Sequence, residues 1–252
     1  MSAARSRVVL VTGTDTGVGK TLVSAAIAAA LAARGVRIAV AKPVETGCPE
    51  RDGELVPEDA VALRHAAGDP APLADVCPHR FPDPLAPALA AERAGAPVDV
   101  DALVAHLRRR ATQAELLLVE GAGGLLVPIT TAASFADLAA RLDAAVLVVV
   151  GSRLGAINAA LLTLEALRAR RLPIAGYVVN RLAPEGDIAV ATNDELLARL
   201  SAERRLGTLP FLPDAGTLLG ALRLHAAARE RARGELARLG ATLVLDALTA
   251  DV

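Results

Sequence analysis

Residues 13–21 read Gly-Thr-Asp-Thr-Gly-Val-Gly-Lys-Thr, and this stretch decides the fold. It follows a short apolar run, Arg7 to Thr12, whose β-branched residues predict a buried strand. It also opens an Ala- and Leu-rich run, Lys20 to Arg34, which predicts a helix that stops at Gly35. A strand, a glycine-rich turn ending in Gly-Lys-Thr and a helix form the pattern of a phosphate-binding loop.

The residue types in this loop match the chemistry of a nucleotide triphosphate. Backbone N–H groups at the start of the helix would hold phosphate oxygens. The Lys20 ammonium would reach the β- and γ-phosphates, and the Thr21 hydroxyl would bind Mg²⁺. Thr14 stands where the strict pattern has glycine, so the loop is a variant.

Outward from the loop, apolar strands alternate with helices along the chain. Because the strands are uniformly apolar, both faces of their sheet should be covered, which is typical of a parallel sheet. We therefore expect an α/β fold, with a mostly parallel sheet flanked by helices on both faces, as in P-loop NTPases. The predicted strands are 7–12, 37–42, 116–119, 145–150, 174–180 and 206–209, and the predicted helices are 20–34, 58–67, 99–113, 134–142, 156–170, 187–200 and 221–239. Ser134 is the expected N-cap of the helix 134–142.

Two stretches predict no regular structure: 44–57, and 69–97, which holds seven of the fifteen prolines. We expect a single domain over residues 1–252, with a C-terminal helical extension from about residue 217. The predicted helix 221–239 is rich in arginine and has one apolar face. A membrane-surface helix could look similar, but Glu230 and Glu235 dilute the charge and large aromatic anchors are missing, so a docked surface helix is favoured.

The composition argues against two classes of partner. The chain has 252 residues, a formal net charge of −1, three Phe, one Tyr and no Trp. It therefore lacks both the charge excess that holds a nucleic-acid backbone or an anionic membrane and the aromatic residues on which bases stack. No apolar run is long enough for a transmembrane helix, and the N-terminal residues contain no secretory stretch, so we expect a cytoplasmic protein.

The cysteines and lysines are few. Cys48 and Cys77 belong to no CxxC pair and have no nearby His at metal-ligand spacing, which favours two free thiols over a zinc site. Against 25 arginines, the only lysines are Lys20 and Lys42. An ammonium is a compact point charge, whereas a guanidinium is a wide planar fork, so both lysines suggest phosphate contacts.

Further candidate site residues stand at predicted strand ends. Lys42 ends the strand 37–42, within the motif Lys42-Pro43-Val44-Glu45-Thr46-Gly47, and Glu120 follows the strand 116–119, before Gly121-Ala122-Gly123-Gly124. A carboxylate at such an end is typical of a metal-facing acid in a P-loop enzyme, and Asp59 is a second candidate. Ligands bind at the carboxyl ends of parallel strands, so these motifs and Asn180 should share one rim of the sheet.

The set of motifs resembles that of the dethiobiotin synthetase family. GTDTGVGKT, KPVETG, the Asp of PEDAVAL, EGAGG, GSRLGAIN and GYVVN occur in the family's order and spacing, over about Val8 to Leu212. The resemblance implies a homodimeric P-loop ligase with ATP as co-substrate and Mg²⁺ as cofactor. Its reaction would convert 7,8-diaminononanoate and CO₂ to dethiobiotin, with ADP and phosphate as the other products.

The resemblance also implies residue roles. Lys20 and Lys42 would be catalytic, and Mg²⁺ would be held by Thr21, Asp59 and Glu120. Substrate would be bound by Thr16 and Thr46, and by Gly155 and Asn158 from the neighbouring subunit. ATP would be bound by Gly17, Val18, Gly19, Lys20, Thr21, Leu22, Asp59, Glu120, Gly121, Ala122, Gly123, Asn180, Pro210, Phe211 and Leu212. Arg181 departs from a well-known member, which has Asp there, so the base preference stays open.

Two rival interpretations remain. ParA and MinD positioning ATPases bind DNA or membrane, but their loop carries a signature lysine that is missing where Asp15 and Thr16 stand. Cobyrinate-type amide synthetases are similar locally but need a glutamine-hydrolysing domain, for which 252 residues leave no room.

Overall fold

Strand β1 (Arg7–Gly13) lies at the centre of a six-stranded sheet whose order is β12-β11-β10-β1-β7-β2. In this computed structural model, which describes residues 7–184 and 187–249, every neighbouring pair in that sheet is parallel. The other strands are β2 (Ile38–Ala41), β7 (Leu116–Gly124), β10 (Ala145–Ser152), β11 (Ile174–Arg181) and β12 (Arg205–Leu209). The predicted absence of a secretory stretch falls mostly on residues 1–6, which lie outside the described residues.

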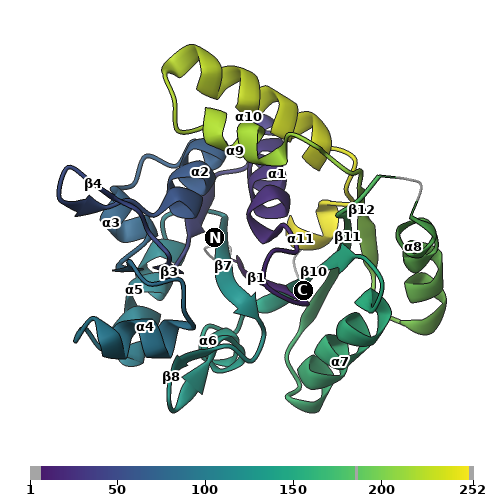
Figure 1. Ribbon diagram of the computed structural model, residues 1–252, viewed down its shortest axis with the longest axis horizontal. Coiled ribbons are helices and arrows are strands. Elements are labelled where there is room, and N and C mark those ends of the chain that lie inside the picture. The colour runs from purple at the N-terminus through teal and green to yellow at the C-terminus, as the bar shows by residue number, and fades with distance from the viewer. Residues whose placement is uncertain (1–6, 185–186, 250–252) are drawn as a thin grey trace, which may run out of the picture.

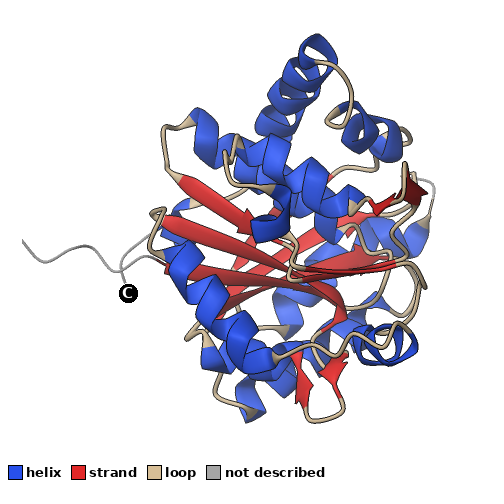
Figure 2. Ribbon diagram, turned by 90° about the vertical axis from the view of Figure 1, so that its left-hand side faces the viewer, coloured by secondary structure: helices blue, strands red, loops and turns tan. Residues whose placement is uncertain are grey.

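Helices cover both faces of the sheet, as Figures 1 and 2 show, and the predicted α/β class is confirmed. The alternation of side chains along β1 explains the two cores: Val9 and Val11 face one layer, and Val8 and Leu10 face the other. The first layer holds α1 (Lys20–Ala33), α2 (Glu58–Ala67), α9 (Ala215–Ala221), α10 (Ala226–Gly240) and α11 (Asp246–Thr249). The second holds α4 (Pro87–Arg93), α5 (Val100–Ala111), α6 (Phe135–Arg141), α7 (Ala156–Ala169) and α8 (Ile188–Leu200).

Three of the helices begin at residues that cap them. Asp99 and Asp187 accept backbone N–H groups from α5 and α8, and Ser134 forms a capping box with Asp137 at the start of α6. The predicted cap at Ser134 is thus confirmed.

The two stretches predicted as irregular contain short elements, so that prediction was wrong in part. β3 (Val44–Thr46) pairs in parallel with β6 (His79–Phe81), and β4 (Glu50–Arg51) pairs with β5 (Glu54–Leu55). A short helix, α3 (Leu73–Val76), also lies here, and β8 (Pro128–Thr130) pairs with β9 (Ala133–Ser134) further on. The β3–β6 pairing joins segments far apart in the sequence, and a local pattern carries no sign of it.

The predicted helix 221–239 starts later than expected: it is α10, which spans Ala226–Gly240. Residues 222–225 form a turn after α9, and Leu222 in this turn is buried in the core. α10 packs on α1, where Gly240 lies so close to Ala26 that an added Cβ would come within 2.0 Å of the Ala26 carbonyl oxygen. Within the described residues, no helix combines the length and apolarity needed to cross a membrane.

Candidate active site

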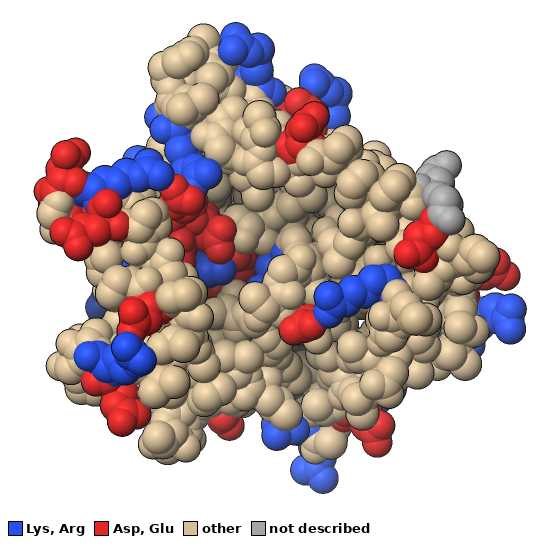
Figure 3. Space-filling model, viewed as in Figure 1, with Lys and Arg blue, Asp and Glu red and all other residues tan. Residues whose placement is uncertain are grey.

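A cavity of about 740 Å³ opens where the strands of the sheet end. Figure 3 shows the hollow on this face, with acidic and basic atoms meeting inside it. The structure brings most of the predicted site residues to its walls: Thr16, Gly17, Gly19, Lys20, Thr21, Leu22, Lys42, Thr46, Asp59, Ala122, Gly123, Asn180, Phe211 and Leu212.

The phosphate-loop glycines have the backbone geometry that a tight turn requires. Gly19, which precedes α1, has φ +86°, and a Cβ there would lie 2.2 Å from the side-chain nitrogen of Asn180. Glycine is the residue that adopts this conformation without steric cost. Lys20 is buried at the start of α1, and its ammonium donates to the Asp15 carbonyl at 3.1 Å.

Strand register brings Lys42 and Glu120 together. Ala41 pairs with Val119 in the β2–β7 ladder. Lys42 follows Ala41 just past the end of β2, and Glu120 follows Val119 within β7. Lys42 Nζ donates to Glu120 Oε1 at 2.6 Å, and the Thr21 hydroxyl donates to the same oxygen at 2.9 Å. Glu120 was predicted to follow its strand, but β7 continues to Gly124, so the carboxylate projects from the strand interior and is fully buried.

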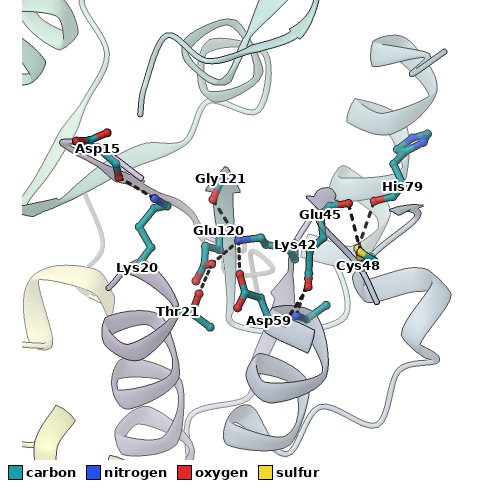
Figure 4. A network of polar contacts seen from close by, with 12 residues as sticks. Asp15, Lys20, Thr21, Lys42, Glu45, Cys48, Asp59, His79, Glu120 and Gly121 are labelled. Atoms are coloured by element: carbon teal, nitrogen blue, oxygen red, sulfur yellow. Dashed lines mark hydrogen bonds and ion pairs between the residues drawn. The ribbon is translucent and has the colours of Figure 1, made fainter. Parts of the chain in front are cut away.

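Asp59 joins this group from a different element. It lies in the first turn of α2, and its Oδ2 accepts from Lys42 Nζ at 3.1 Å. Figure 4 shows the Lys42 ammonium between Glu120 and Asp59, with the Gly121 carbonyl beyond it. Lys42 therefore connects β2, β7 and α2 through one charged atom.

The two lysines differ in electrostatic environment. Burial, followed by the nearby charge of Lys42, lowers the pKa of Lys20 to about 8. Burial acts on Lys42 in the same direction, but the carboxylates of Glu120 and Asp59 outweigh it, and the pKa of Lys42 is raised. Burial opposes ionisation of Asp59, yet the Lys42 charge holds the Asp59 pKa below its usual value. Lys42 is thus a firmly protonated cation in this site.

The donor set here fits a magnesium ion. Glu120 Oε2 is buried and has no hydrogen-bond partner, so one carboxylate oxygen is free to coordinate a metal. The Thr21 hydroxyl and the Asp59 carboxylate supply further oxygens on the cavity wall. Mg²⁺ prefers a few protein oxygens completed by phosphate and water, which agrees with this sparse set. No larger cluster of three His, Cys, Asp or Glu side chains suited to a metal occurs in the described part of the chain.

The far end of the cavity is apolar. Phe211 and Leu212 line it together with Leu219 of α9. Asn180 and Arg181 are polar side chains on the same wall, and Asn180 lies next to Gly19 of the phosphate loop. Asn180 donates to the Val18 carbonyl at 2.9 Å, while its own side-chain oxygen is buried without a partner. A flat base bearing an amino group would suit this combination of apolar walls and one free acceptor.

Several predicted residues lie outside the cavity wall. Val18, Glu120 and Gly121 are buried behind it, and Pro210 is exposed beside it. Gly155 and Asn158 are exposed at the start of α7 and do not line the cavity. Arg153 lies three residues before Ala156, the first residue of α7. It forms an ion pair with Asp15 that ties this segment to the phosphate loop.

The sequence interpretation did not assign two features of the site. Glu45 lies on the cavity wall and is buried, and its carboxylate accepts backbone N–H groups from α2. Burial, followed by the charge of Asp59, raises the pKa of Glu45 to about 7. Its position inside the Lys42–Gly47 motif was the available signal. The other feature is α9, whose Ala215, Gly216 and Leu219 line the cavity.

Both cysteines are free, as predicted, and both are buried. Burial raises the pKa of Cys48 to about 11 and also raises that of Cys77. Neither thiol is therefore ionised at neutral pH, which removes both as nucleophiles.

Comparison with known proteins shows the family to which the chain belongs. The model of the AAA domain family AAA_26 matches residues 7–217. A protein of Anaeromyxobacter dehalogenans strain 2CP-C, named ATP-dependent dethiobiotin synthetase BioD, is 47% identical over 82% of this chain and 92% of its own. One of Anaeromyxobacter sp. strain K with the same name is 44% identical over 85% of this chain and 98% of its own.

Solved structures establish the fold. A ParA family ATPase from Chlorobium tepidum TLS is 15% identical, with a TM-score of 0.56 over 97% of this chain and 100% of its own. The MinD cell division protein of Aquifex aeolicus is 17% identical, with a TM-score of 0.54 over 92% of this chain and 95% of its own. At these identities the likeness shows the architecture alone. The chain belongs, by its relatives and by the matched domain family, to the ATP-dependent dethiobiotin synthetases.

Proposed function

We propose that this protein is a ligase of biotin biosynthesis that converts 7,8-diaminononanoate, CO₂ and ATP to dethiobiotin, ADP and phosphate. The observation that carries the proposal is the convergence of Lys20, Thr21, Lys42 and Asp59 on one cavity, with Glu120 buried behind Thr21 and Lys42. Proteins of this family, with 42–47% identity over most of the chain, bear the name of that activity.

The chemistry needs positioning and charge stabilisation rather than a protein nucleophile. One amine of the substrate adds to CO₂ and forms a carbamate. A carbamate oxygen attacks the γ-phosphorus of ATP, and ADP leaves. The second amine then attacks the carbonyl carbon of the mixed anhydride, which closes the five-membered ureido ring and releases phosphate. In such a series of reaction steps the protein lowers the activation barrier by orienting the reactants and by supplying charges that are in place before the reaction.

Two cations of the chain would stabilise the transferring phosphoryl group. Lys20, at the start of α1, would contact the β- and γ-phosphates, while Gly17 to Leu22 would supply backbone N–H groups. Lys42, held by Glu120 and Asp59, would stabilise the carbamate and the γ-phosphate. Asn180, Pro210, Phe211 and Leu212 would contact the base, and Gly121 to Gly123 would leave room beside the nucleotide.

We assign the metal ligands as Thr21, Asp59 and Glu120, whose oxygens fit Mg²⁺. Bound there, Mg²⁺ would neutralise part of the charge on the β- and γ-phosphates. Lys42 contacts both carboxylates, so it would supply a second positive charge next to these ligands.

We also propose that the protein is a homodimer in which α7 of one subunit completes the substrate site of the other. Thr16 and Thr46 would bind the amine end, and Gly155 and Asn158 of the neighbouring subunit would bind the carboxylate tail at a helix N-terminus. Leu154, next to Gly155, is 88% exposed, which suits a residue that a second copy covers. Size-exclusion chromatography with light scattering should give a dimer mass, and Leu154→Glu should give a monomer with impaired turnover. A fully active wild-type monomer would contradict this assembly.

The chain would act as one cytoplasmic domain with a helical C-terminal extension, since α9 lines the cavity and α10 packs on α1.

The activity is tested by incubating the protein with diaminononanoate, bicarbonate and MgATP, and measuring dethiobiotin by mass spectrometry alongside phosphate release. We expect one phosphate per dethiobiotin, and no phosphate without the diamine. Equal phosphate release with and without the diamine would overturn the proposal, whatever its rate.

A further inference from the structure

Glu45 is a buried carboxylate for which the proposed reaction has no direct task. It lies in β3, three residues after Lys42, with only 7% of its surface exposed. Its Oε1 accepts the Asp59 N–H at 2.9 Å, and its Oε2 accepts the Ala60 N–H at 3.0 Å. Figure 4 shows the Glu45 side chain pointing toward Asp59, next to Lys42.

These two bonds replace a cap that α2 lacks. The first N–H groups of a helix have no partner within the helix, and a side chain just before it usually accepts one of them. Pro57 precedes α2 and forms no side-chain cap, whereas Asp99, Ser134 and Asp187 cap their own helices. In α2 the acceptor comes from β3, a segment outside the helix. The start of α2 is therefore tied to the strand that follows Lys42.

The tie closes a ring of contacts around the metal-binding oxygens. Glu45 holds the backbone of Asp59, and the Asp59 carboxylate holds the Lys42 ammonium at 3.1 Å. The chain itself completes the ring, because only Pro43 and Val44 separate Lys42 from Glu45. A shift of α2 would thus move Asp59 away from Lys42 and from Glu120.

From this ring we infer that Glu45 is a positioning residue: it holds the Asp59 carboxylate and the Lys42 ammonium where the metal–nucleotide complex needs them. The inference rests on the proposed ATP-dependent function. It predicts that loss of Glu45 weakens metal binding beyond what the loss of a helix cap explains. If the cap served stability alone, its removal would lower the stability of the protein, as removal of a cap from another helix does, without weakening metal binding.

The experiment compares Glu45→Gln with Asp99→Ala in the full-length protein. Asp99→Ala removes a cap of the same kind, a carboxylate accepting from Ala102 N at 2.9 Å, at the start of α5. We would measure the melting temperature, the dissociation constant of Mn²⁺ with saturating ADP by electron paramagnetic resonance, and kcat together with the half-saturating Mg²⁺ concentration. Both variants should lower the melting temperature, but only Glu45→Gln should weaken Mn²⁺ binding, by about tenfold.

A second variant separates position from stability. In Glu45→Ala combined with Pro57→Asp, α2 would carry its own cap, while the tie to β3 stays broken. Recovery of the melting temperature with weakened Mn²⁺ binding would support the inference. Recovery of both would overturn it, as would Mn²⁺ binding by Glu45→Gln within twofold of the wild type. The binding of Mn²⁺ and ADP needs no diamine. A wild-type protein that binds both yet forms no dethiobiotin would therefore refute the proposed reaction, but it would not affect the positioning role inferred for Glu45.

Discussion

The Nζ atom of Lys42 lies 2.6 Å from Oε1 of Glu120, in an ion pair whose side chains are 5% and 0% exposed. A buried pair of this kind persists only where further hydrogen bonds satisfy both charges. Asp59 and the Gly121 carbonyl supply acceptors for Lys42, and the Thr21 hydroxyl supplies a second donor to Glu120. The pair therefore places a fixed positive charge beside the oxygens assigned to the metal.

Lys42→Arg should lose activity as fully as Lys42→Gln. The guanidinium is a wide planar fork, and it does not fit where a compact ammonium meets Glu120, Asp59 and the Gly121 carbonyl. We expect kcat to fall by about 100-fold or more in both variants, as for other charges that stabilise a transition state. Steady-state dethiobiotin formation measures the effect, with circular dichroism to verify folding. Near-wild-type turnover of the Arg variant would disprove the point-charge argument.

Glu120→Gln should raise the Mg²⁺ concentration needed for half-maximal activity. The change removes the negative charge and replaces one carboxylate oxygen by an NH₂ group, which does not coordinate a metal, in a side chain whose Oε2 now has no partner. We expect an increase of about tenfold or more in a Mg²⁺ titration. Glu115→Gln is the matched control, because Glu115 precedes the same strand and pairs with Arg37 on the surface. An unchanged titration for Glu120→Gln would remove this residue from the metal ligands.

Arg110→Met should destabilise the fold much more than Arg168→Met. Arg110 forms an ion pair with Asp69 in which both side chains are at most 5% exposed, and Asp69 also accepts the Val40 N–H. Removal of the arginine leaves a buried carboxylate unpaired, which costs about 3 kcal/mol. The Arg168–Glu203 pair is on the surface, and its loss should cost less than about 1 kcal/mol. Urea unfolding of both variants measures the difference, and equal losses would contradict the prediction.

Gly240→Ala should separate α10 from α1. An added Cβ would lie 2.0 Å from the Ala26 carbonyl oxygen, so the backbone must move, at a cost of about 1–3 kcal/mol in unfolding free energy. Gly234→Ala, in the same helix, meets only the far end of Arg238 at 4.0 Å and should stabilise the helix by up to about 1 kcal/mol. Opposite signs in thermal unfolding would verify the docked position of α10. Equal effects would mean that α10 is not held against α1.

Both cysteines should resist thiol reagents in the folded protein. A thiol with a pKa near 11, as for Cys48, is ionised at about one part in a thousand at pH 8, and Cys77 is also raised by burial. Because the thiolate is the reactive form, labelling with a disulfide reagent should be slow at pH 8 and should become fast for two thiols in 6 M guanidinium. Rapid labelling of the native protein would show that one cysteine is accessible.

The sequence alone determined the features that reside in a few consecutive residues. The phosphate loop between β1 and α1, the parallel sheet with its helices, the Ser134 cap and the free thiols follow from local pattern and composition. Lys20, Thr21, Lys42, Glu120 and Asn180 were predicted to share one rim of the sheet, because the strands that precede them are parallel.

Only the tertiary structure decided how these residues contact one another. That Glu120 lies inside β7 against Lys42 depends on the register between β2 and β7. That Glu45 caps α2, and that α9 lines the cavity, depends on the packing of segments distant in the chain. The physical reason is that hydrogen-bond partners and register are chosen by the whole core, whereas a sequence pattern reports the preference of each segment in isolation.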